Sequence, residues 1–61
     1  MSRRSQPSNS RVRILIVEDS PTQAQQLRHI LEHQGYEVAV AANGRLALEM
    51  APQFRPALII S

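Results

Sequence analysis

The chain contains no cysteine and no tryptophan, and its only aromatic residues are one tyrosine and one phenylalanine. Without cysteine, neither a disulfide nor a thiolate metal site can stabilise a chain of 61 residues. The core must therefore be built from aliphatic side chains, and a domain of this size buries only about 60% of its unfolded surface. The absence of cysteine also agrees with a cytoplasmic location, which we predict.

Long apolar runs are absent as well. No segment approaches the roughly 18 consecutive apolar residues that a membrane-spanning helix requires. The N-terminal residues carry charges but no apolar segment of the kind found in signal peptides. We therefore predict that this chain has no membrane partner.

The positive charge is concentrated at one end of the chain. Residues 1–11 contain Arg3, Arg4 and Arg11 and no acid, whereas residues 12–61 contain four arginines against five acids. We predict a disordered basic tail over residues 1–11 and one domain over residues 12–61. Three arginines without interleaved aromatic residues are more typical of a solvated leader than of a nucleic-acid-binding arm, so we expect no nucleic-acid partner.

The most informative segment is a run of four aliphatic residues, 14–17, followed directly by Glu18 and Asp19. Such a run predicts a strand of a parallel sheet that is buried on both faces. In open α/β sheets, ligands bind beyond the carboxyl ends of the strands. Two adjacent carboxylates at that place favour a hard divalent cation, with Mg²⁺ as the leading candidate. The alternative is that Asp19 only compensates the dipole of the following helix.

Strand and helix patterns alternate along the remaining chain. We predict strands over residues 12–17, 36–41 and 58–60, the last with the character of a doubly buried strand. Helices are predicted over residues 21–34 and 45–51. The first helix has an apolar stripe of Ala24, Leu27, Ile30 and Leu31, and the second an inner face of Leu46 and Ala47 with Met50 or Leu48.

Local signals set the expected helix ends. Ser20 and Gln23 form a capping box around Pro21, in which the Gln23 side chain reaches back to the Ser20 N–H. Asn43 is expected to cap the second helix. Gly35 is expected to stop the first helix in the left-handed conformation, and Pro52 to end or kink the second helix near residue 51.

The two histidines, His29 and His33, are four positions apart in the first predicted helix. This spacing can place two imidazoles on one metal ion. The intervening residues do not match a zinc-protease motif, and we interpret the pair as exposed surface residues. A phosphorelay histidine would need a helical bundle, which the alternating strand and helix pattern contradicts.

Five segments of the chain together resemble a receiver domain of two-component response regulators. They are residues 14–21, 35–38, 42–44, 47–48 and 56–61. These segments have the order and spacing of that family and extend over the whole chain except the N-terminal tail. The resemblance implies an α/β, flavodoxin-like fold with parallel strands in the spatial order 2-1-3. It also implies Mg²⁺ as the cofactor, with Glu18 and Asp19 matching the acidic pair that helps to hold it.

The resemblance further implies a histidine kinase as partner. In the family, the kinase transfers a phosphoryl group to an aspartate that directly follows the segment resembled by residues 58–61. Asp19 is the only aspartate of this chain. We therefore expect a truncated receiver, the first half of the domain, that supplies the metal-binding pair but is neither an enzyme nor active in phosphotransfer alone.

Two other functions and the assembly state of the chain are also considered from the sequence. The chain could instead be a non-catalytic pseudo-receiver that acts as a protein-interaction or assembly module. A nucleotide-binding protein is disfavoured because residues 18–21 replace the glycine-rich loop that such a protein needs after its first strand. We also expect a homodimer or higher oligomer formed through the strand Leu58–Ile60, whose edge would otherwise be unpaired.

Overall fold

A computed structural model describes residues 11–61, so the predicted tail over residues 1–11 lies almost entirely outside the described residues. Three strands and two helices alternate along the described chain: β1 (Arg13–Val17), α1 (Pro21–His33), β2 (Glu37–Ala41), α2 (Gly44–Phe54) and β3 (Leu58–Ile60). The predicted sequence of elements is confirmed, and most of their bounds agree with the predictions to within one residue.

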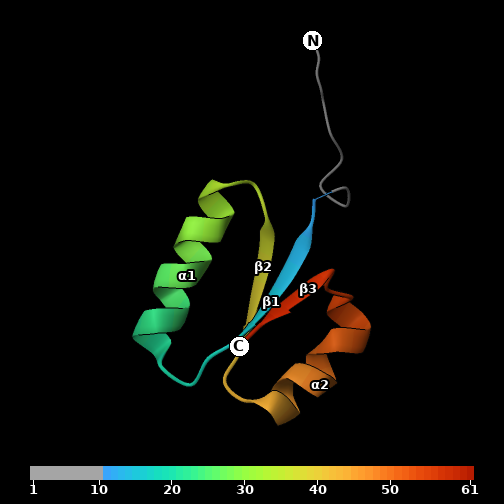
Figure 1. Cartoon of the computed structure of the whole chain (residues 1–61). Coiled ribbons are helices and arrows are strands. Elements are labelled where there is room, and N and C mark those ends of the chain that lie inside the picture. The colour runs from blue at the N-terminus through green and yellow to red at the C-terminus, as the bar shows by residue number, and fades with distance from the viewer. Residues whose placement is uncertain (1–10) are drawn as a thin grey trace.

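The strands form one parallel sheet in the order β2-β1-β3, as predicted. β1 is therefore the central strand and pairs along both of its edges. Figure 1 shows α1 and α2 on opposite sides of this sheet. The arrangement is that of a flavodoxin-like half-domain, in which each crossover between parallel strands carries one helix.

The residues of β1 alternate between the two faces of the sheet. On the α2 face, Leu15 forms a buried cluster with Ala41 and Ala47, and the partly buried residues packed against this cluster are Val17, Ala39, Leu46, Met50 and Phe54. On the α1 face, Ile14 and Ile16 are buried. Burial on both faces explains why this segment is a continuous aliphatic run rather than an alternating one.

The predicted stop of α1 at Gly35 is confirmed. Gly35 has a φ of 96°, which is a conformation that glycine adopts without steric cost. Its N–H donates to the Glu32 carbonyl at 3.0 Å, and the Tyr36 N–H donates to the Leu31 carbonyl at 3.1 Å. These two bonds form a Schellman motif, which satisfies carbonyls at the helix end and turns the chain into β2.

The predicted end of α2 near residue 51 was wrong, because the helix continues through Pro52 to Phe54. Proline removes the bond that its own N–H would have donated, and its ring crowds the carbonyl four residues earlier, but neither effect ends the helix here. The following turn is held by the Arg55 N–H, which donates to the Ala51 carbonyl at 2.7 Å. The Arg13 side chain adds a bond from Nε to the Phe54 carbonyl at 2.7 Å.

Two predicted apolar positions are not buried. Ile30 of the α1 stripe is 56% exposed, because α1 packs on β1 and β2 and this side chain lies outside the contact. Leu48 is 77% exposed, so the inner face of α2 uses Met50 instead. β3 also lacks the predicted double burial: Leu58 and Ile59 are exposed, since neither described helix packs on this strand.

Candidate functional site

Glu18 and Asp19 directly follow β1, at the carboxyl edge of the sheet. The Glu18 backbone N–H donates to the Ala41 carbonyl at 3.0 Å, so Glu18 is still fixed to the end of β2. Glu18 is partly buried, whereas Asp19 is exposed. The two carboxylates are thus anchored at their bases by the strand pairing, at the place where α/β proteins bind ligands.

The side chain of Glu18 takes part in starting α1. Its Oε2 accepts the Ser20 backbone N–H at 3.1 Å. The prediction that the Gln23 side chain would accept this N–H was wrong, since Glu18 already does so from the end of β1. The other half of the capping box is confirmed, because Ser20 Oγ accepts the Gln23 N–H at 3.3 Å.

The register of β3 brings the end of that strand to the same place. Ile60 is paired with Ile16 in the parallel ladder between β3 and β1. When this register is continued, Ser61 is level with Val17, and the position that follows Ser61 is level with Glu18. A side chain at that following position would therefore lie at the same sheet edge as the carboxylates.

The carboxylate oxygens of Glu18 and Asp19 are ligands of the type that Mg²⁺ prefers. This ion is bound in proteins by carboxylate oxygens and usually keeps several water ligands. Asp19 offers an exposed carboxylate, and Glu18 retains its second oxygen, Oε1, beside the one bonded to Ser20. Residues 11–61 contain no group of three or more histidine, cysteine, aspartate or glutamate side chains that could hold a metal ion. These two carboxylates could therefore supply only part of an octahedral shell.

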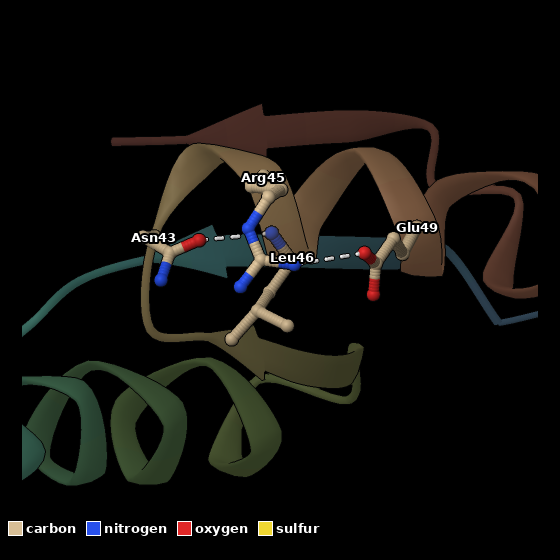
Figure 2. A network of polar contacts seen from close by, with 4 residues as sticks. All are labelled: Asn43, Arg45, Leu46 and Glu49. Atoms are coloured by element: carbon tan, nitrogen blue, oxygen red, sulfur yellow. Dashed lines mark hydrogen bonds and ion pairs between the residues drawn. The ribbon is translucent and has the colours of Figure 1, made fainter.

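The polar groups at the start of α2 serve the helix itself (Figure 2). Asn43 follows β2, and its Oδ1 accepts the Leu46 N–H at 2.9 Å, as predicted for a cap. Arg45 pairs with Glu49 at 3.1 Å on the exposed side of the helix. The described contacts of these side chains are thus within α2, and none of them reaches Glu18 or Asp19.

His29 and His33 are both exposed on α1, in agreement with the surface interpretation. Their ring centroids are 5.6 Å apart and the ring planes differ by 19°. His29 also contributes to a surface hollow of about 630 Å³, with Gln25, Gln26, Arg28, Ile30 and Glu32. This hollow is formed along α1 and includes neither of the two carboxylates.

The family model for the response regulator receiver domain matches residues 14–61, which is most of the chain. The chain belongs to this family. Receiver domains generally bind Mg²⁺ and act in signalling with partners such as kinases. The match includes β1 from its second residue, the carboxylates that follow it, and the whole of β2 and β3, so the fold and the family agree.

Two curated relatives support this assignment of a receiver. The chain is 42% identical to Protein PilH of Pseudomonas aeruginosa over 48 residues, which cover 79% of this chain and 40% of PilH. It is 38% identical to the DNA-binding response regulator MtrA of Mycolicibacterium smegmatis over 50 residues, which cover 82% of this chain and 22% of MtrA. The chain therefore matches less than half the length of either relative. No solved structure matches it significantly.

Neither helix of residues 11–61 has the length and apolar character needed to cross a lipid bilayer.

Proposed function

We propose that this receiver supplies the Mg²⁺-binding carboxylates for phosphoryl transfer from a histidine kinase in a two-component system. The observation that carries the proposal is the register of β3, which puts the position following Ser61 level with Glu18. In the family, that position is the phosphoacceptor aspartate. An aspartate there would lie at the same sheet edge as the two carboxylates that follow β1.

The residues of this chain have two roles in the proposed reaction. Asp19 offers an exposed carboxylate as a metal ligand, and Glu18 adds a second carboxylate while its Oε2 holds the Ser20 N–H. When bound, Mg²⁺ offsets negative charge on the oxygens of the transferring phosphoryl group. The group leaves a nitrogen of the kinase histidine and forms a P–O bond with the aspartate. The receiver is thus a phosphoacceptor rather than an enzyme, and we place it in the cytoplasm with its kinase.

The metal assignment predicts that Mg²⁺ binds the 61-residue chain weakly and the complete receiver more tightly, because two carboxylates form an incomplete shell. Calorimetric titration with MgCl₂ should show that Asp19→Asn abolishes the weak binding. Glu49→Gln is a matched control that removes one exposed carboxylate from α2. Equal affinity in the wild type and in Asp19→Asn would remove the metal assignment.

The phosphotransfer proposal predicts different outcomes for two lengths of the protein. Acetyl phosphate with MgCl₂ should leave the 61-residue chain unmodified, because its only aspartate is Asp19. The complete receiver of the parent protein should gain one phosphoryl group on the residue that follows Ser61, as detected by intact-mass spectrometry. A stable adduct on Asp19 would contradict the proposal. A parent residue other than aspartate at that position would favour the non-catalytic pseudo-receiver.

A further inference from the structure

The C-terminal half of α1 exposes two imidazoles side by side. His29 and His33 are one helical turn apart, with ring centroids separated by 5.6 Å and ring planes within 19° of parallel. Both residues are exposed. They are also the only histidines of the sequence, which contains no cysteine. An imidazole ligand for a transition metal must therefore be one or both of these two side chains.

We propose that His29 and His33 together chelate one divalent transition-metal ion, such as Ni²⁺, Zn²⁺ or Cu²⁺. Imidazole nitrogen is a preferred ligand of these ions. Bonds of about 2.0–2.1 Å to a tetrahedral ion require the two nitrogens to be about 3.3 Å apart. The two rings lie on adjacent turns and both residues are exposed, so rotation about the side-chain bonds can bring one nitrogen of each ring to this distance.

The charges around the pair permit a cation. The only arginine or lysine of α1, Arg28, forms an ion pair with the carboxylate of Glu32 at 3.3 Å. His33 is the last residue of α1, and the carbonyl end of a helix favours positive charge. The remaining coordination positions would be filled by water, since residues 11–61 provide no third ligand in a cluster. The ion is thus bound reversibly.

This site differs from the carboxylates in position and in chemistry. Glu18 and Asp19 precede α1, whereas His29 lies about 12 Å further along the helix axis from Pro21. Mg²⁺ prefers oxygen ligands, and the other ions prefer imidazole. Excess MgCl₂ should therefore fail to displace a transition-metal ion from the histidines.

Calorimetric titration of the 61-residue chain with NiCl₂ tests the chelate. If both imidazoles bind one ion, His29→Gln and His33→Gln should each weaken binding by about tenfold or more, because the second ligand acts at high effective concentration. The matched control combines His33→Gln with Gln34→His. It keeps two imidazoles but separates them by about 140° around the helix, and it should bind no better than either single variant.

A second measurement separates loss of the site from loss of folding. NiCl₂ should raise the melting temperature of the wild type, as followed by circular dichroism, and should leave that of the spacing control unchanged. Variants must first show the wild-type spectrum without metal. Three results would each overturn the proposal. They are a loss of affinity of less than about tenfold in the single variants, wild-type affinity in the spacing control, and displacement of Ni²⁺ by MgCl₂.

Discussion

At the scale of single residues, the adjacent carboxylates Glu18 and Asp19 have different surroundings. Glu18 is partly buried, is held by its backbone to Ala41, and accepts the Ser20 N–H. Asp19 is exposed and has no described hydrogen bond. Glu18 thus stabilises the start of α1 while presenting its other oxygen, and Asp19 is the carboxylate that is freer to meet a ligand.

This difference predicts unequal effects on stability. Glu18→Ala should lower the free energy of unfolding by about 1–2 kcal/mol, because the Ser20 N–H loses a charged acceptor. Asp19→Ala should lower it by only about 0.5 kcal/mol through the lost interaction with the helix dipole. Urea unfolding followed by circular dichroism measures both values. Equal losses would show that the bond from Glu18 to Ser20 contributes little.

At the scale of elements, α2 shows how neighbouring contacts compensate for a local helix breaker. Pro52 removes one backbone donor from the last turns of the helix. Beyond it, Phe54 packs partly against the buried cluster, and Arg13 donates to its carbonyl. The chain then leaves the helix through Arg55, whose φ of 55° is uncommon for a residue with a side chain. Tertiary contacts with β1 thus extend α2 beyond the point that its local sequence indicates.

The other end of α2 depends on Asn43. Asn43→Ala should lower the free energy of unfolding by about 1 kcal/mol, because the Leu46 N–H loses its capping acceptor. Glu49→Gln is the control, since the exposed pair with Arg45 contributes only about 0.3–0.5 kcal/mol. Both variants change the contacts drawn in Figure 2. Thermal unfolding in low salt compares the two variants. The prediction would be contradicted if Glu49→Gln were less stable than Asn43→Ala.

At the scale of the whole molecule, β3 forms one edge of the sheet and exposes apolar side chains on both faces. Leu58 is 52% and Ile59 53% exposed, and the paired positions in β1 place these two residues on opposite faces. The outer edge of β3 has no strand partner among residues 11–61. An apolar edge with unpaired backbone groups is a template for another strand.

We therefore predict that the 61-residue chain self-associates through β3, with a second copy as the partner. Light scattering at low micromolar concentration should give at least a dimer. Ile59→Lys should shift the mass toward the monomer, because charge on an edge strand opposes pairing. Leu48→Lys on α2 is the control for an exposed apolar residue elsewhere, and it should leave the mass unchanged. A folded monomer of 6.9 kDa in the wild type would refute the prediction.

The sequence predicted the fold well because its signals are local. The aliphatic run of β1, the caps at Ser20 and Asn43, and Gly35 each act within a few residues. The errors in the end of α2 and in the burial of β3 arose where distant segments meet. The hydrogen bond from Arg13 to Phe54 joins residues 41 positions apart in the sequence. The exposure of β3 depends on how the two helices pack, since neither lies against this strand. The candidate carboxylates were predicted from their position after a buried strand, but the bond of Glu18 to Ser20 required the loop geometry.

The central place of β1 has a consequence for synthesis on the ribosome. β1 is the first described element to be translated, yet both strands that pair with it lie downstream. At translation rates of about 5–20 residues per second, β3 is synthesised on the order of seconds after β1. The backbone groups on the edge of β1 that pairs with β3, at Ile14, Leu15 and Ile16, therefore have no strand partner in the nascent chain during this time. Until β3 is made, this unpaired edge is open to pairing with a strand of another chain.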